Sequence, residues 1–374
     1  MKTKPSSLRA ITILCAYSAI FALLAVWVAT AHSQSSLAGS PFNVGYRIIG
    51  VPYQKDGQKK TLTVAVWYPT AETPKPYGYG GPTRGNVALN AELLNSDGPY
   101  PLLVFSHGYG GGGISSVFFT EALAAKGWIV AAPDHGDNYS VLRIRQGQVA
   151  FDRQGFLREA KEITLSNPEN RNKYLYRVTE MQAVIDYLLT TDPFHNLVDV
   201  SRLAVGGHSM GGFTALGVCG TIKAQHDSRI KAVLLFSTGA GGYLFTGKEL
   251  QAVKIPLMLF LGERERKQMR GGQTMTDLSE KIYEAASGPK YFLEIKGANH
   301  FSFNNRLIDN SASRRLSGTG EQFDAIRRYS IAFLEKHVAG RQSADPTLNE
   351  KHPLVVRYLK EPVAERTTPV PEGE

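Results

Sequence analysis

The sequence predicts an α/β fold, with a mixed, mostly parallel sheet of eight strands flanked by helices. Two observations carry this prediction. In an early apolar segment, Leu62, Val64 and Val66 alternate with Thr and Ala, which is typical of antiparallel strands with one solvated face. Later segments, such as 102–105 and 257–260, are continuous apolar runs of the kind found in parallel strands covered on both faces.

The predicted elements follow one another along a single domain that covers residues 40–340. The strands are expected at 44–51, 61–67, 101–105, 128–132, 203–206, 232–236, 256–261 and 291–295. Segments with helical spacing separate the later strands, and they lie at 115–126, 174–189, 209–222, 275–286 and 321–337. An antiparallel start followed by alternating strands and helices is the basis of the mixed sheet.

Three regions do not fit this alternation. Residues 70–99 are rich in Gly, Pro and Asn and are expected to form a surface excursion. Residues 138–172 form a charged insertion between a strand and a helix. Residues 341–374 form a polar C-terminal tail with five prolines, which we expect to be an extended wrap or a disordered segment.

Residues 1–31 have the pattern of an export signal. Three basic residues precede position 10, residues 10–28 are mostly apolar, and Ala29-Thr30-Ala31 has the small-x-small pattern of a cleavage site. We therefore expect a secreted or periplasmic protein. An uncleaved N-terminal anchor is the alternative, because roughly 20 apolar residues can span a bilayer.

Composition excludes several classes of protein. The 374 residues include 42 Lys and Arg against 33 Asp and Glu, a net charge of +9, with no basic run longer than two. This dispersed charge argues against a nucleic-acid-binding protein. Only Cys219 remains after the predicted signal, so no internal disulfide is expected. Without a His-Glu-x-x-His or paired-cysteine motif, neither a catalytic metal nor another cofactor is expected.

The sharpest motif is a Gly-x-Ser-x-Gly sequence at 207–211, between a predicted strand and a predicted helix. A turn this tight holds its serine in strained backbone geometry and requires small flanking residues, and the hydroxyl of Ser209 then projects at the carboxyl end of the sheet. The following helix directs its N-terminus to the same place, where its dipole favours negative charge. Ser209 is therefore the candidate nucleophile, and the alternative is a Gly-rich turn with a helix-capping serine.

A serine hydroxyl becomes a good nucleophile only when a base takes its proton. His300 directly follows the last predicted strand and is the candidate base. His337 ends a predicted helix and His352 lies in the polar tail, so both are expected at the surface, while His208 is expected to pack beside the nucleophile.

The candidate acid is Glu265, the fourth residue of a Gly-x-x-acid turn after the penultimate predicted strand. Glu263, a carboxylate elsewhere and a plain surface charge run at 263–266 are the alternatives. The chain order Ser209, Glu265, His300 is that of nucleophile, acid and base in one known type of serine hydrolase.

A glycine-rich loop at 106–113 follows another predicted strand and reads Ser-His-Gly-Tyr-Gly-Gly-Gly-Gly. Glycines let a backbone approach a substrate closely, so the backbone N–H groups of Tyr109 and Met210 are the candidate oxyanion donors. A phosphate-binding loop would need a Gly-Lys-Ser/Thr ending, which is absent.

With these residues in place, the chain resembles the α/β-hydrolase superfamily. Within it, the chain is similar to the bacterial branch grouped with platelet-activating factor acetylhydrolase (isoform II) and dienelactone-hydrolase-like proteins. The resemblance rests on Trp-Tyr-Pro at 67–69, Ser-His-Gly at 106–108, the 207–212 turn and the 297–300 loop. It implies hydrolysis of carboxylic esters.

Polyester-cleaving cutinases are also similar, through the Gly-Tyr oxyanion loop, the Gly-His-Ser-Met-Gly-Gly turn and the His-Phe after the last strand. Two departures qualify these resemblances. The acetylhydrolases carry their acid after the strand that ends here at 236–239, where this chain has no carboxylate, and this favours Glu265. Cutinases typically place a tryptophan there, which this chain lacks, as it lacks their paired C-terminal cysteines.

Together these features predict an exported serine hydrolase that cleaves carboxylic esters, with short acyl chains, through an acyl-enzyme on Ser209. A polyester hydrolase, an amidase and a catalytically silent α/β-hydrolase binding module are the alternatives. The expected partner is a small-molecule or lipid-like ester, with no nucleic acid. Membrane contact is expected only through the N-terminal segment, if that segment is not cleaved.

Overall fold

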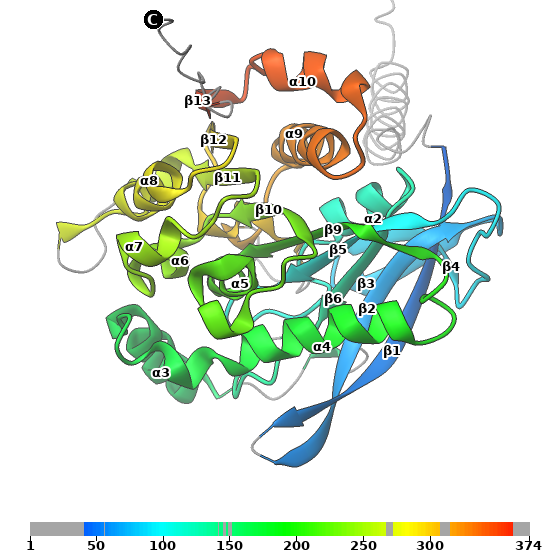
Figure 1. Cartoon of the computed structure of the whole chain (residues 1–374), viewed down its shortest axis with the longest axis horizontal. Helices are drawn as coiled ribbons and strands as arrows, with labels where there is room; N and C mark the ends of the chain where they lie inside the picture. Colours follow the sequence, from blue (N-terminus) through cyan, green and yellow to red (C-terminus); the bar gives the residue numbers. More distant parts are fainter. Residues whose placement is uncertain are drawn as a thin grey trace, which may run out of the picture. The chain divides into compact units, whose positions relative to one another are not determined.

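A computed structural model describes residues 41–55, 57–140, 142–144, 147–148, 152–266, 272–306 and 315–361. The predicted export signal at 1–31 lies outside these residues. The described chain is built around a sheet with the strand order β13-β12-β11-β10-β9-β5-β6-β2-β1-β4-β3 (Figure 1). This confirms the predicted mixed α/β fold, although the sheet has eleven strands rather than eight.

All eight predicted strands are present in the sheet. They are β1 (Asn43–Lys55), β2 (Gln58–Thr70), β5 (Tyr100–Ser106), β6 (Ile129–Pro133), β9 (Val198–His208), β10 (Ile230–Phe236), β11 (Leu257–Gly262) and β12 (Lys290–Ile295). β1 and β2 pair antiparallel, as do β2 and β6, whereas β6, β5, β9, β10, β11 and β12 pair in parallel. The early segment with alternating apolar residues is therefore in antiparallel strands, and the later continuous apolar runs are in parallel strands, as their patterns predict.

The three further strands come from the regions that did not fit the alternation. Residues 70–99 form the hairpin of β3 (Lys75–Gly80) and β4 (Thr83–Leu89), and β4 pairs with β1. The ring of Tyr46 on β1 lies 5.4 Å from Tyr77 and 5.3 Å from Tyr79, so these aromatic side chains pack the hairpin onto the sheet. In the predicted tail, β13 (Val355–Glu361) pairs antiparallel with β12.

Helices cover both faces of the sheet. The five predicted helices are α2 (Val117–Ala124), α4 (Tyr176–Thr190), α5 (Met210–Leu216), α8 (Met275–Ala285) and α9 (Gly320–His337). α2 and α9 pack together on one face, and α4 and α5 pack on the other (Figure 1). Further helices are α3 (Arg153–Leu165), α6 (Gly239–Tyr243), α7 (Gly247–Leu250) and α10 (Asp345–Asn349), and a small hairpin of β7 (Leu142–Arg143) and β8 (Gly147–Gln148) precedes α3.

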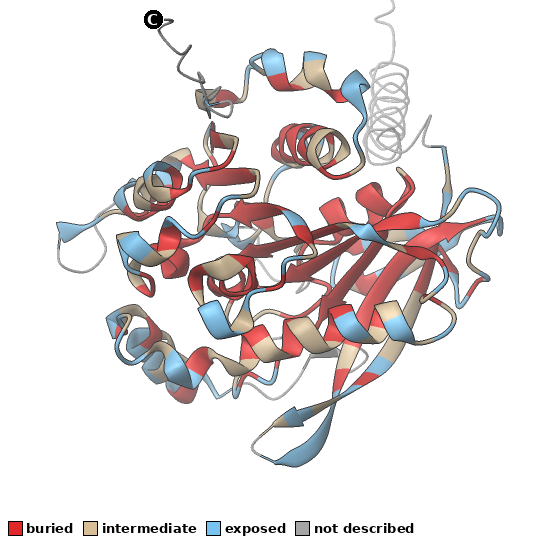
Figure 2. Ribbon diagram, in the orientation of Figure 1, coloured by how far each residue is buried: buried red, intermediate tan, exposed pale blue. Residues whose placement is uncertain are grey.

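The core lies between the sheet and these helices. Every residue of β5, β6 and β11 is buried, while the tip of the β1–β2 hairpin is exposed (Figure 2). Because parallel strands end at the same edge of a sheet, the segments that follow β5, β9, β10, β11 and β12 meet there. The candidate functional residues all lie in these segments.

Candidate active site

Ser209 lies in the sharp turn between β9 and α5. Its φ of 55° and ψ of −116° are in a region that non-glycine residues rarely adopt, at a cost of about 1–3 kcal/mol. The turn also needs glycine on both sides. A Cβ atom at Gly207 would lie 2.2 Å from the carbonyl oxygen of Gly211, and one at Gly211 would lie 2.0 Å from that of Ser106. Both contacts are with backbone, so neither glycine can be replaced without moving the main chain.

Three predicted side chains form a hydrogen-bonded line at this edge. The Oγ atom of Ser209 lies 2.9 Å from Nε2 of His300, and Nδ1 of His300 lies 3.1 Å from Oε2 of Glu265. His300 begins the short 3₁₀ turn after β12, and Glu265 ends the one after β11. The side chain of His300 is 32% exposed and that of Glu265 is 4% exposed, so the histidine is open to solvent while the carboxylate is covered.

Ser237 joins this line and was not identified from the sequence. It directly follows β10, with a φ of 44°, and its hydroxyl donates to Oε2 of Glu265 at 2.5 Å. The hydroxyl oxygen of Ser237 also lies 2.6 Å from Nδ1 of His300. Because its own hydrogen is directed at Glu265, it is an acceptor for a proton on that nitrogen. The other oxygen of Glu265 accepts from the backbone N–H of Gly262 at 2.8 Å, so the carboxylate is held on both sides.

The alternative acid and the neighbouring histidine have other contacts. Glu263 accepts a hydrogen bond from the backbone N–H of Gly297 at 2.7 Å. Nε2 of His208 lies 2.8 Å from the carbonyl oxygen of His300, and the two rings are 4.8 Å apart. Burial, together with the nearby His300, lowers the pKa of His208 to about 3, so the His208 ring is neutral at ordinary pH and supports the backbone of His300.

The two candidate oxyanion donors lie beside the serine. Met210 is the first residue of α5, where a backbone N–H has no acceptor within its own helix. A Cβ atom added to Gly108 would lie 3.1 Å from Cβ of Ser209, so the loop that precedes Tyr109 runs directly against the turn. The ring of Tyr109 stacks on Phe156 of α3, with centroids 5.2 Å apart and planes at 11°. The charged insertion therefore supports this loop.

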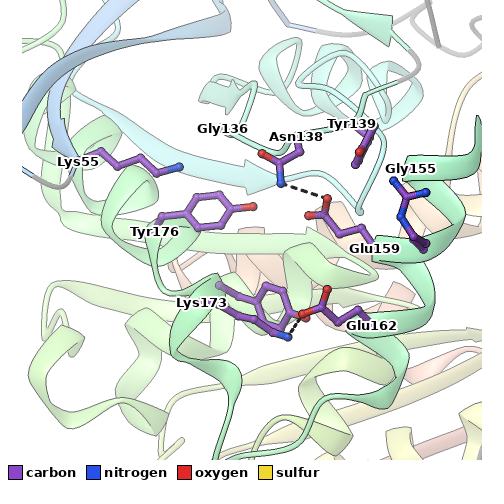
Figure 3. A pocket seen from close by; sticks show the side chains of 11 residues that line it. Lys55, Gly136, Asn138, Tyr139, Gly155, Glu159, Glu162, Lys173 and Tyr176 are labelled. Atoms are coloured by element: carbon purple, nitrogen blue, oxygen red, sulfur yellow. Dashed lines mark hydrogen bonds and ion pairs between the residues drawn. The ribbon is translucent and has the colours of Figure 1, made fainter. Parts of the chain in front are cut away.

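A cavity of about 550 Å³ lies next to α3 and the start of α4 (Figure 3). Figure 3 shows two hydrogen bonds within it, from Asn138 to Glu159 and from Lys173 to Glu162. The hydrogen-bonded residues 209, 265 and 300 do not line it. Its lining residues are Lys55, Gly136, Asn138, Tyr139, Gly155, Arg158, Glu159, Glu162, Lys173, Tyr174 and Tyr176.

A family profile described as PETase, PET hydrolase-like, matches residues 73–342, which is more than half of the chain. The chain belongs to the PET hydrolase-like family. The match extends from the β3–β4 hairpin beyond α9, so it includes the hydrogen-bonded residues 209, 237, 265 and 300.

Curated relatives of this PET hydrolase-like chain are ester hydrolases. It is 26% identical to platelet-activating factor acetylhydrolase of Cavia porcellus, over 68% of this chain and 62% of the relative. It is 25% identical to cutinase est2 of Thermobifida alba, over 70% of this chain and 65% of the relative. The matches thus span less than two thirds of the length of these two relatives.

A solved structure of a ferulic acid esterase from Streptomyces cinnamoneus superposes with a TM-score of 0.65. It is 19% identical, and the match covers 86% of this chain and 97% of the other, which supports the α/β-hydrolase fold. The resemblance to α/β hydrolases that the motifs of this PET hydrolase-like chain predicted is thus confirmed.

The described residues contain neither a membrane-spanning helix nor a metal-binding cluster. None of their helices has the length and apolar character needed to cross a bilayer. Within the same part of the chain, no group of three or more His, Cys, Asp or Glu side chains is arranged to hold a metal ion.

Proposed function

We propose that this protein is an exported serine esterase that cleaves carboxylic esters with short acyl chains through an acyl-enzyme on Ser209. The observation that carries the proposal is the hydrogen-bonded line from Glu265 through His300 to Ser209, at 3.1 and 2.9 Å. A line of this kind lets an imidazole remove the serine proton while a carboxylate stabilises the imidazolium that forms.

In the proposed reaction, Nε2 of His300 takes the proton of Ser209 as Oγ bonds to the ester carbonyl carbon. The carbonyl oxygen becomes an oxyanion, which the N–H groups of Tyr109 and Met210 stabilise, each contributing about 100- to 1,000-fold in rate. The carbon–oxygen bond to the alcohol then breaks, and His300 gives its proton to the leaving alkoxide. Water repeats these steps on the acyl-enzyme and releases the acid.

In this scheme Glu265 and Ser237 together hold the imidazole. Both present an acceptor to Nδ1 of His300, so the proton stays on Nδ1 and the lone pair of Nε2 faces Ser209. The side-chain hydroxyl of Ser237 also shares its own proton with Glu265 and keeps that carboxylate in place.

Export and partners belong to the same proposal. The charge and apolar pattern of residues 1–31 supports export, with the folded part outside the cytoplasm. The partner we propose is a small or lipid-like ester, with no nucleic acid. Contact with a membrane would come only through an uncleaved N-terminal segment.

Cleavage of polyesters is a second candidate function. It is favoured by the PET hydrolase-like family profile and by the two Thermobifida alba cutinases among the relatives, est1 and est2, each 25% identical to this chain. An amidase and a silent binding module are less well supported. Relatives such as platelet-activating factor acetylhydrolase and esterase YjfP of Escherichia coli are named as ester hydrolases, and the three polar side chains are in hydrogen-bonded contact.

The test compares the purified chain with Ser209→Ala on p-nitrophenyl acetate, butyrate, octanoate and palmitate. We expect turnover that is greatest on the short esters and absent in the variant. Faster release of acid from a polyester film than from soluble esters would favour the second candidate. Turnover of anilides alone would indicate an amidase, and no turnover on any of these substrates would indicate a binding module.

A further inference from the structure

A buried polar network lies beneath the loop that carries Tyr109. It links the end of β5, the segment after β6 and the first turns of α4, and every member is at most 4% exposed. We call it the loop-anchor network, and it comprises Ser106, His107, His135, Asp137, Arg177 and Glu180. Buried charges of this kind are costly unless they are paired and fully hydrogen-bonded, so their arrangement calls for an explanation.

One branch of the network fixes the backbone of the loop at position 107. Arg177 on α4 binds both carboxylate oxygens of Asp137, at 2.8 and 2.6 Å, and donates to the carbonyl oxygen of His107 at 2.9 Å. Although burial opposes ionisation, the Arg177 charge holds the pKa of Asp137 well below its usual range. The pair is therefore ionised at any ordinary pH, and Arg177 remains a donor to the loop.

The second branch fixes the ring of His107. Its Nδ1 lies 2.7 Å from the carbonyl oxygen of Gly108, and its Nε2 accepts from the backbone N–H of His135 at 3.1 Å. Nδ1 also lies 3.4 Å from Nη2 of Arg177, a longer contact than the one with the carbonyl. Because a carbonyl can only accept and a backbone N–H can only donate, the two shorter contacts assign the proton of His107 to Nδ1. Burial, and then the charge of Arg177, lower the pKa of His107 well below its usual value, which keeps the ring neutral.

The third branch holds His135, whose backbone N–H binds the ring of His107. Oγ of Ser106 lies 2.7 Å from Nε2 of His135, and Nδ1 of His135 lies 2.8 Å from Oε2 of Glu180. The side chains repeat the serine, histidine, glutamate order of the candidate active site, but all three are fully buried. No substrate reaches them, so their role is to hold the segment after β6 in place.

These contacts have one consequence for the candidate oxyanion site. The carbonyl oxygen of Gly108 accepts both from His107 and from the backbone N–H of Gly111, at 3.0 Å. In a trans peptide the N–H of the next residue points away from this carbonyl, so the two bonds also set the direction of the Tyr109 N–H. The same glycine lies against Ser209, where that N–H is needed.

We propose that the loop-anchor network sets the oxyanion donor, with His107 as the positioning residue that holds the Gly108–Tyr109 peptide in its productive orientation. The inference rests on the proposed function, because an oxyanion forms only if Ser209 attacks a carbonyl. His107 touches no substrate, and it acts through one peptide group.

The test is a pair of amide substitutions that separate the two ring nitrogens of His107. In His107→Asn, the side-chain NH₂ occupies the place of Nδ1 and still donates to the Gly108 carbonyl. In His107→Gln, the amide reaches the place of Nε2 and leaves that carbonyl with one donor. We expect kcat to fall by about 100-fold or more for Gln, as for loss of an oxyanion donor, and by less than about 10-fold for Asn. KM should change little in either variant.

A second readout tests the mechanism rather than the fold. An alkylboronic acid adds to a catalytic serine and places an oxygen in the oxyanion position, so its inhibition constant should rise in parallel with the loss of kcat in His107→Gln. The matched control is the same pair of substitutions at His337, which is half-buried on α9 against Tyr291. Those variants should keep wild-type kcat and boronate inhibition.

Equal kcat values for the Asn and Gln variants, or unchanged boronate inhibition in folded His107→Gln, would overturn the proposal. Should both variants fail to fold, the imidazole ¹⁵N spectrum of the wild-type chain decides. A proton on Nδ1 of His107 supports the proposal, and a proton on Nε2 refutes it. Absence of any turnover by the wild-type chain is a failure of the proposed function instead, and the Ser209→Ala comparison detects it separately.

Discussion

The most informative single change is Glu265→Gln, because the structure gives His300 two acceptors at Nδ1. Glutamine has nearly the same shape as glutamate and keeps an oxygen for the N–H of Gly262, so the fold should survive. Its NH₂ group, however, replaces the oxygen that faces Ser237 and His300. The imidazolium formed in the reaction then loses its negatively charged partner.

The size of the effect follows from the contacts that remain. A hydrogen bond to a charged group is worth about 1.5–3 kcal/mol, which corresponds to about 10- to 100-fold in rate. Loss of the correct histidine tautomer is more serious and costs about 10⁴-fold. Since Oγ of Ser237 lies 2.6 Å from Nδ1 of His300 and still accepts its proton, Glu265→Gln should show only the smaller loss.

Ser237 is tested in the same experiment. Ser237→Ala removes two hydrogen bonds, the one with His300 and the one that Ser237 donates to Glu265. Glu265 keeps its bond from the N–H of Gly262 and its place 3.1 Å from His300, so the imidazole loses only a neutral hydrogen bond of about 0.5–1.5 kcal/mol and activity should fall only about 2- to 10-fold. The double variant has no acceptor left at Nδ1 and should lose about 10⁴-fold. This is more than the two single losses multiplied together, as expected for residues that act as one unit.

The assay is kcat/KM on p-nitrophenyl butyrate, with a melting temperature for each variant. Glu263→Gln is the matched control, because that carboxylate lies two residues away and binds only the N–H of Gly297 among the contacts described for it. It should retain wild-type activity. A loss of about 10⁴-fold in Glu265→Gln alone would refute the role given to Ser237. Full activity in Glu265→Gln would refute Glu265 as the acid.

Three further predictions concern the stability and the association of the folded chain. Burial raises the pKa of Glu121 to about 7, above its value in an unfolded chain. This group therefore stabilises the folded state at low pH and loses that contribution as pH rises through about 7. The melting temperature of wild type minus that of Glu121→Gln should be larger at pH 5 than at pH 8, and a pH-independent difference would contradict this. Gly211→Ala should destabilise the fold by about 1–3 kcal/mol and abolish activity, because its Cβ atom would meet backbone, whereas Gly247→Ala, with nothing within 4 Å, should melt like wild type in calorimetry. Deleting residues 355–374 removes β13 and exposes the edge of β12, so the truncated chain should self-associate more than the full chain in size-exclusion chromatography. The same association state for both chains would show that β13 does not protect this edge.

The local pattern was sufficient for much of the fold. The eight predicted strands and five predicted helices depend on periodicity within short segments, and the structure contains all of them. The candidate residues Ser209, Glu265 and His300 could be singled out for a related reason. Each directly follows a strand or lies a few residues after one, and parallel strands bring such positions to the same edge whatever the details of packing.

The β3–β4 hairpin and β13 could not be predicted in this way. Gly and Pro dominate the local signal of residues 70–99. The pairing of β4 with β1 and the packing of Tyr77 and Tyr79 against Tyr46 make that segment part of the sheet. β13 is a short stretch in a tail that is otherwise polar and rich in proline, and it is a strand because its backbone pairs with β12. In both cases the partner lies far away in the sequence, so no local pattern reveals it.

The sequence by itself therefore determined the class of fold, the order of its main elements and the residues that meet at the edge of the sheet. The tertiary structure alone decided how those residues are held. The contact of Ser237 with His300 and the bond from Arg177 to the backbone of His107 join segments with no common motif. These hydrogen bonds require distances of about 3 Å between their donor and acceptor atoms. Such distances are set only when the whole sheet and its helices are in place.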